Sequence, residues 1–270
     1  MKKHVIVVLC CAVFACCALV PMLSSAQIVA NRQQVLTQAR HAYYNLRDEG
    51  LAEFECSVTP NWKALLADQR KADPAGADSA INTLSQLQFN AKLGADGKVK
   101  LTHNELSGQS EEMKKALAQI YGGMEQMTSG FFETWSLFML DHPFPEVASE
   151  YQLEAVGPQY RLSYKDGAAS VATTMGRDFA ISSLDVTSKE FKSSIQPKFN
   201  RIPKGLLFSA YDASYTSNTP TEATQLKVQI GYQEVDGMQV LKQLNLSGTY
   251  GGSPFAVELA FSDCKVKKKQ

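Results

Sequence analysis

The sequence predicts an α+β protein built on one large curved antiparallel sheet with helices packed against it. Apolar and polar residues alternate with a period of two through much of residues 150–264, which puts one face of each strand in a core and the other in water. Turn-forming pairs separate these runs. A segment rich in methionine and aromatic residues at helical spacing precedes them, and such a helix would cover one face of a sheet.

The alternation is clearest in three runs. Their inward-facing residues are Tyr160/Leu162/Tyr164, Leu226/Val228/Ile230/Tyr232 and Phe255/Val257/Leu259/Phe261. Four turn pairs punctuate the stretch: Gly157-Pro158, Asp166-Gly167, Asp236-Gly237 and Gly251-Gly252. Each pair can adopt turn dihedrals that other residues avoid. Several strands at this spacing, joined by tight turns, indicate an antiparallel meander.

The N-terminus has the features of a secretory signal peptide over residues 1–26. A basic opening is followed by an apolar run from Val5 to about Leu23, and Ser24-Ser25-Ala26 supplies small residues before a cleavage site. We therefore expect cleavage before Gln27 and a periplasmic or secreted mature protein. An uncleaved anchor is the alternative, because the run is nearly long enough to span a bilayer. The apolar residues that follow Cys16 argue against lipidation there.

Four of the six cysteines lie in the signal peptide, so only Cys56 and Cys264 remain. An even pair in an exported protein most simply forms one disulfide, here between the first and last strands. The bridge would close a loop of about 200 residues, for which the chain-entropy estimate is ~5 kcal/mol. We expect it to be structural; two free thiols or a metal pair are the alternatives, and no ligand lies at metal-binding spacing near either cysteine.

The mature chain would carry 25 Lys+Arg residues against 27 Asp+Glu residues, a net charge of −2. This near-neutral net charge is unlike the basic surface of a nucleic-acid-binding protein. We interpret the lysines at 265 and 267–269 as a solvated tail. About 244 residues without repeats or linkers are consistent with a single domain, with a helix-rich part (27–148) and the meander (149–264).

Local patterns give the order of the first elements. Helical spacing predicts a helix over residues 27–48, ended by Gly50, and a strand over 51–58 follows with Phe54, Cys56 and Val58 on one face. The remaining expectations are a short helix opened by Pro60, a break at residues 73–76, a second helical piece over 78–84 and a hairpin over 87–101.

Residues 110–140 form the most distinctive helical segment. Ser110, Glu111 and Glu112 suit a helix N-terminus. Glycines at 122, 123 and 130 predict a kink or two separate helices. The end of the segment, residues 137–140, is apolar all round and must be covered on more than one side.

No catalytic signature stands out. The sequence has no nucleophile elbow, phosphate loop, metalloprotease motif or dinucleotide fingerprint. His41, His103 and His142 are far apart and lack local partners, so each is interpreted as a surface or packing residue. We expect no catalytic residues, no metal and no cofactor.

The helical segment has two interpretations. In the first it is ordinary core that covers the sheet. In the second, helix and sheet enclose an apolar cavity, whose walls adapt to varied acyl chains because the methionine thioether is flexible. The residues assigned to such a cavity or its lid are Met124, Met127, Phe131, Phe132, Trp135, Phe138 and Met139.

The order of elements resembles the periplasmic lipoprotein-carrier superfamily, which includes the outer-membrane lipoprotein carriers. The residues that carry the resemblance are 179–186 (FAISSLDV), the following run 191–199, and the hairpin 232–238 (YQEVDGM). The resemblance implies an unclosed half-barrel with helices packed on its concave face. It also implies a lipid or lipoprotein acyl chain as the ligand, with possible envelope protein partners.

Two functional hypotheses follow. The first is an exported, non-enzymatic protein that holds a lipid or lipoprotein acyl chain in the half-barrel, in lipid or lipoprotein trafficking of the cell envelope. The second is a periplasmic structural or sensory module whose sheet packs fully on its helices and leaves no cavity. An envelope hydrolase would require catalytic residues dispersed in the sequence.

Overall fold

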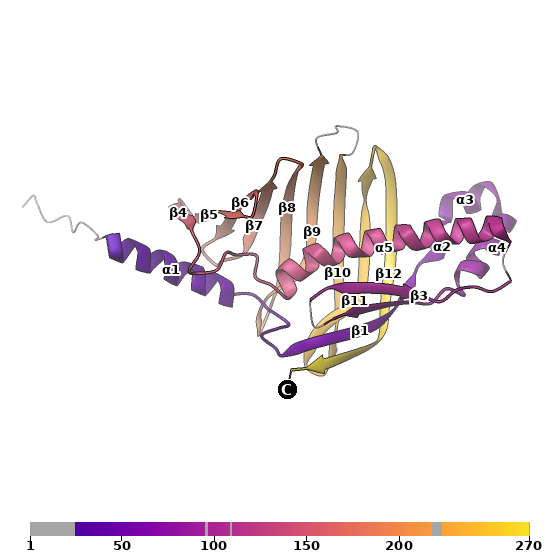
Figure 1. The fold of residues 1–270 in the computed structure, drawn as a ribbon, viewed down its shortest axis with the longest axis horizontal. Helices are drawn as coiled ribbons and strands as arrows, with labels where there is room; N and C mark the ends of the chain where they lie inside the picture. The colour runs from indigo at the N-terminus through magenta and orange to yellow at the C-terminus, as the bar shows by residue number, and fades with distance from the viewer. Residues whose placement is uncertain (1–24, 95–96, 109, 218–222, 270) are drawn as a thin grey trace, which may run out of the picture.

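Twelve antiparallel strands form one curved sheet that does not close, and helices pack on its concave face (Figure 1). The computed structural model describes residues 25–94, 97–108, 110–217 and 223–269. The strand order is β3-β2-β1-β12-β11-β10-β9-β8-β7-β6-β5-β4. The predicted α+β half-barrel is therefore confirmed.

The strands are β1 (Leu51–Pro60), β2 (Phe89–Leu93), β3 (Val99–His103), β4 (Tyr151–Val156), β5 (Gln159–Asp166), β6 (Ala169–Gly176), β7 (Ile181–Thr187), β8 (Phe191–Ile202), β9 (Gly205–Ser217), β10 (Thr224–Val235), β11 (Met238–Tyr250) and β12 (Ser253–Lys268). The helices are α1 (Ser25–His41), α2 (Trp62–Leu65), α3 (Ala67–Ala72), α4 (Pro74–Leu84) and α5 (Glu111–Met139).

Strands β4 to β12 form the predicted meander, each pairing with the next along the chain. The predicted turn pairs connect them, and Gly157, Gly167, Asp236, Gly237, Gly251 and Gly252 all have positive φ. The first three strands extend this sheet, because β1 pairs with β12 on one side and with β2 on the other. The chain thus enters the sheet at an interior position, and β3 and β4 form its two edges.

Helix α1 ends at His41, seven residues before the predicted end at Asp48. The start of β9 binds the chain directly after the helix: Leu206 N donates to Ala42 O (2.8 Å) and Tyr44 N donates to Leu206 O (3.0 Å). The Tyr43 hydroxyl donates to Phe179 O (2.6 Å). The helix therefore ends at His41, although apolar residues at helical spacing continue in the sequence. The tertiary hydrogen bonds outweigh the helix propensity of this segment.

The first helical insertion also differs in detail from the prediction. Pro60 ends β1, and Asn61 caps α2, its side chain accepting from Ala64 N. The predicted break at residues 73–76 is instead a helix start, because Asp73 caps α4 through Gly76 N and Pro74 occupies the first turn. The predicted hairpin over residues 87–101 is confirmed as β2 and β3.

Helix α5 is one continuous helix of 29 residues, so the predicted division into two helices is wrong (Figure 1). Ser110 caps it, accepting from Met113 N. The glycines do not break the helix because its central and C-terminal turns pack on the sheet, and packing outweighs a helix-propensity loss of about 1 kcal/mol per glycine. As predicted, its apolar end is covered: Phe138, Met139 and Leu140 are buried.

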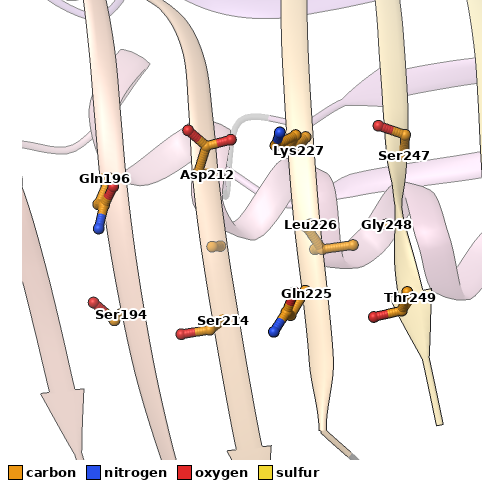
Figure 2. Close-up of a pocket in the computed structure, with 11 residues that line it drawn as sticks. Ser194, Gln196, Asp212, Ser214, Gln225, Leu226, Lys227, Ser247, Gly248 and Thr249 are labelled. Carbon is orange, nitrogen blue, oxygen red and sulfur yellow. The ribbon is translucent and has the colours of Figure 1, made fainter. Parts of the chain in front are cut away.

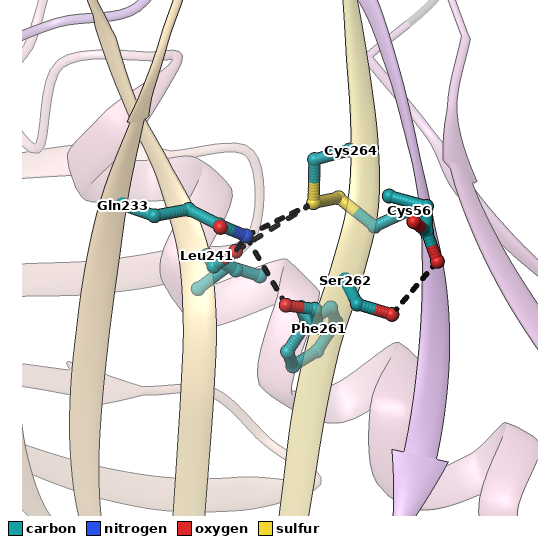
Figure 3. The surroundings of a disulfide bond; sticks show 7 residues. Cys56, Gln233, Leu241, Phe261, Ser262 and Cys264 are labelled. Atoms are coloured by element: carbon teal, nitrogen blue, oxygen red, sulfur yellow. Dashed lines mark hydrogen bonds between the residues drawn. A yellow bond between two sulfur atoms is a disulfide. The ribbon is translucent and has the colours of Figure 1, made fainter.

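The two remaining cysteines face each other across β1 and β12, as predicted (Figure 3). Cys56 and Cys264 lie at disulfide-bonding distance, at a sequence separation of 208. The pairing of β1 with β12 shifts register here, and Asp263 has φ +52°. This geometry is that of a β-bulge, which places one extra β12 residue opposite β1.

The Gln233 side chain sits beside this bulge. Its amide nitrogen donates to Leu241 O (2.9 Å) and Phe261 O (3.1 Å), and it lies 3.3 Å from Cys264 Sγ (Figure 3). Strands β10 and β11 also shift register between Gly231 and Tyr232. The side-chain amide of Gln233 therefore donates to two backbone carbonyls at places where the strand pairing is irregular. Buried carbonyl groups require such a hydrogen-bond partner.

The expected signal peptide falls almost entirely on residues 1–24, which lie outside the described residues. Within the described part of the chain, no helix is both long and apolar enough to cross a membrane.

Removal of the disulfide should destabilise the protein strongly. In the Cys56→Ser/Cys264→Ser variant the free energy of unfolding should fall by up to ~5 kcal/mol, because a cross-link over 208 residues restricts the unfolded chain. Urea unfolding of wild type and variant, each with and without reductant, measures the loss. Reductant should lower only the wild-type midpoint; an equal response from both proteins would contradict the assignment.

Gly205 should be required for docking of the segment after α1. Its φ is +123°, and an added Cβ would lie 2.7 Å from Ala42 O. Gly205→Ala should therefore lower the free energy of unfolding by about 1–3 kcal/mol. Gly237→Ala is the matched control, since φ is +79° but the Cβ would meet nothing within 4 Å. Equal losses in urea unfolding would show that the close approach to Ala42 contributes nothing.

Candidate functional site

A groove of about 630 Å³ lies between α5 and the concave face of strands β8–β12. Helix α5 crosses these strands (Figure 1). The helix contributes Gly123, Gln126, Met127, Gly130, Phe131, Glu133, Thr134 and Leu137. The strands contribute Ile195, Tyr211, Tyr215, Thr224, Leu226, Leu246, Tyr250 and Phe255. Most of these side chains are apolar or aromatic, as in sites that bind small apolar ligands.

Two adjacent stripes of α5 have different roles. The core stripe is buried against the sheet and consists of Met124, Thr128, Phe132, Trp135, Phe138 and Met139; Phe131, also buried, lies at its edge and lines the groove as well. The groove stripe runs from Gly123 to Leu137 at spacings of three and four residues, and faces the open space. The helix therefore touches the sheet along one side and stands away from it along the other.

The seven residues assigned to the cavity from the sequence divide between these stripes. Met127 and Phe131 line the groove. The other five (Met124, Phe132, Trp135, Phe138 and Met139) are buried and pack in the core. Trp135 is fully buried, so its side chain helps to hold α5 against the sheet.

Trp135 fixes α5 to the sheet through a hydrogen-bonded chain. Its indole N–H donates to the Tyr232 hydroxyl (3.2 Å), which in turn donates to Phe208 O (2.5 Å). Burial is the largest cause of the raised pKa of Tyr232, with the hydrogen bond from Trp135 acting in the opposite direction. Each polar atom of the chain is thus satisfied, and loss of one member would leave a buried group unpaired.

Two of the glycines of α5 lie in the groove stripe. A Cβ at Gly123 or Gly130 would meet nothing within 4 Å, and both residues line the groove. The glycines that predicted a kink therefore leave space in a straight helix. A side chain at either position would extend into the groove.

Three hydroxyl groups form a polar cluster in the groove wall. Thr134 on α5 and Tyr211 and Tyr215 on β9 all line the groove, and Thr134 acts on the pKa of both tyrosines. Burial raises the pKa of Tyr211 and of Tyr215, and Thr134 acts in the opposite direction. The tyrosine hydroxyls consequently stay protonated and uncharged over a wide pH range.

Sequence reasoning missed the groove residues that the strands contribute. Tyr211 and Tyr215 lie on one face of β9 with Ala213 between them, a period-2 signal that the sequence displays. The signal marks an inward face but does not say whether that face meets a helix or an open space.

A second hollow of about 280 Å³ lies on the opposite face of the sheet (Figure 2). Its polar lining residues come from four adjacent strands: Ser194, Gln196, Asp212, Ser214, Gln225, Lys227, Ser247 and Thr249. The Asp212 carboxylate already pairs with Lys198 Nζ (2.8 Å). The hollow is thus a shallow part of the solvated face and presents no converging reactive groups.

The three histidines in the described part of the chain do not meet. His41 lies at the end of α1 and contacts Thr37 O (2.8 Å); His103 on β3 stacks on Tyr121, with ring centroids 3.5 Å apart. His142 follows α5, 3.7 Å from Asp48, and burial is the main cause of its lowered pKa. The described residues contain no cluster of metal-ligating side chains.

We compared the chain with protein-family models, with curated proteins and with solved structures, and none of them matched.

Proposed function

We propose that this protein is a non-enzymatic binding protein that holds an acyl chain of a lipid or lipoprotein in the groove beneath α5. The observation that carries the proposal is the groove itself: a continuous apolar space bounded by one stripe of α5 and the inward residues of five strands. Its volume of about 630 Å³ lies within the ~300–1,000 Å³ range of sites for small ligands.

The binding force would be burial of apolar surface. Each Å² of acyl chain removed from water contributes roughly 25 cal/mol. Met127 and Phe131 on the helix and Leu226, Leu246 and Phe255 on the strands supply the apolar walls. The flexible Met127 side chain would let these walls adapt to chains of different shape.

We further propose that the protein acts outside the cytoplasm, in lipid or lipoprotein trafficking of the cell envelope. A disulfide between β1 and β12 fits an oxidising compartment. The signal-peptide pattern of residues 1–26 and the resemblance to periplasmic lipoprotein carriers point to the same setting.

The alternative, an interaction module without a cavity, requires the sheet and helices to pack completely. The groove opposes that interpretation, because apolar residues of α5 and of five strands line an open space where complete packing would leave none.

Filling the groove should abolish ligand binding without harming the fold. Gly130→Leu places a branched side chain in the groove, where a Cβ meets nothing within 4 Å. Affinity for the uncharged apolar dye phenylnaphthylamine, followed by fluorescence, should fall by about tenfold or more. The free energy of unfolding should stay constant or rise by up to ~1 kcal/mol, because leucine favours helix over glycine.

Gly122→Leu is the matched control, since Gly122 has the same helical setting and open space around its Cβ but does not line the groove. This variant should bind the dye as wild type does. Native mass spectrometry with organic extraction, on protein purified from an exporting host, should in addition release a co-purified lipid from wild type. Failure of wild type to bind dye or lipid would overturn the proposal and favour the interaction module.

A further inference from the structure

We infer that the groove beneath α5 selects a single-chain amphiphile whose head group is uncharged and forms hydrogen bonds, such as a hydroxyl, ester or amide, seated at Thr134, Tyr211 and Tyr215. The inference rests on the proposed function and names the class of ligand. Three independent features of the groove support it: the charge of its lining, its hydroxyl cluster and its size.

The charges of the described lining residues do not favour an anion. Among these residues there is no lysine, arginine or histidine. Their one carboxylate is that of Glu133, next to Thr134, and its charge acts on Tyr215. A carboxylate or phosphate head group drawn into this groove would lose its hydration, gain no counter-charge and meet a like charge. The groove therefore disfavours fatty-acid anions and phospholipids.

The hydroxyl cluster supplies what an uncharged head group needs. Thr134, Tyr211 and Tyr215 all line the groove, and Thr134 acts on the pKa of both tyrosines, as expected of neighbouring hydroxyl groups. Each hydroxyl can donate one proton and accept at its oxygen lone pairs, so the cluster can serve both donor and acceptor atoms of a ligand. Since burial raises the pKa of both tyrosines, the cluster offers neutral donors and acceptors at physiological pH.

The position of the cluster gives the ligand an orientation. Thr134 and Tyr211 are buried, whereas Tyr215 is partly exposed. Thr134 lies on the groove stripe of α5 between Phe131 and Leu137. A head group held by the cluster therefore has apolar lining residues on either side of it along the helix. Its acyl chain can extend past Met127 toward Leu246 and Phe255.

The size of the groove limits the number of chains. About 630 Å³ corresponds to one ligand of drug-like size. A lipid with two or three long chains would leave much of its apolar surface in water.

The test compares three amphiphiles with the same twelve-carbon chain: monolauroylglycerol (uncharged), laurate (anionic) and dodecyltrimethylammonium (cationic). Isothermal titration calorimetry at pH 8, below the concentrations at which each forms micelles, measures their affinities for the full chain. We expect monolauroylglycerol to bind about tenfold or more tightly than laurate, and more tightly than the cation. Equal or tighter binding of either charged amphiphile would overturn the inference.

Variants separate the head-group contacts from the groove as a whole. Thr134→Val and Tyr215→Phe should each weaken monolauroylglycerol binding several-fold and leave phenylnaphthylamine binding unchanged. Glu133→Gln should strengthen laurate binding and narrow its gap to monolauroylglycerol. The controls are Tyr164→Phe, on β5, and Glu125→Gln, on the outer side of α5; neither residue lines the groove, so neither change should alter any affinity.

The outcomes distinguish this inference from the function on which it rests. Binding of the dye and of all three amphiphiles with equal affinity would leave the groove as a ligand site and refute the head-group selection. Unchanged monolauroylglycerol binding in both Thr134→Val and Tyr215→Phe would refute it too. Binding of neither dye nor amphiphile would refute the proposed function itself.

Discussion

Trp135 donates its indole N–H to the Tyr232 hydroxyl, which donates to Phe208 O, and this chain sets where α5 lies above the sheet. The aromatic residues around it, Phe54 and Phe132, pack edge-on against the indole ring. Together they hold one stripe of α5 in the core while the neighbouring stripe stays free. If α5 rolled toward the groove, the buried indole of Trp135 would lose its hydrogen bond to Tyr232, which costs about 1–3 kcal/mol. The open groove thus depends on the hydrogen bond between Trp135 and Tyr232, although neither residue lines the groove.

The sheet contributes the other wall through irregularities that its ladders accommodate. Bulges in the β1–β12 and β10–β11 pairs lie close to Gln233, whose side-chain amide donates hydrogen bonds to Leu241 O and Phe261 O. Bulges increase the local twist and bend of a sheet. The disulfide ties β1 to β12 at the same place, so the strands β1–β3 continue the curvature and face α5. An unclosed sheet can then enclose its helix on one side without closing into a barrel.

Much of this architecture could be predicted from the sequence, because it is encoded by short-range patterns. Alternation along β5, β10 and β12, the glycine turns and the isolated cysteine pair each depend on residues close in sequence or on simple elimination. The end of α1 could not be predicted, since it is set by Leu206, which is 162 residues beyond Tyr44. Of the residues assigned to a cavity, Met127 and Phe131 line the groove. Composition marks α5 as apolar but cannot say which stripe meets the sheet, so the other five could not be separated from the core.

The glycines of α5 lower its helix propensity, but the division into two helices that was predicted from them does not occur. Gly123 and Gly130 lower the intrinsic stability of the helix by about 1 kcal/mol each, and the helix stays straight because its core stripe is anchored elsewhere. Larger residues would raise the helix propensity at these positions, but their side chains would extend into the groove. Glycine there lowers stability and leaves the groove that contains Thr134, Tyr211 and Tyr215 open. The structure therefore departs from maximum stability where an apolar chain and a neutral polar group could be held together, which is the pattern expected of a binding site.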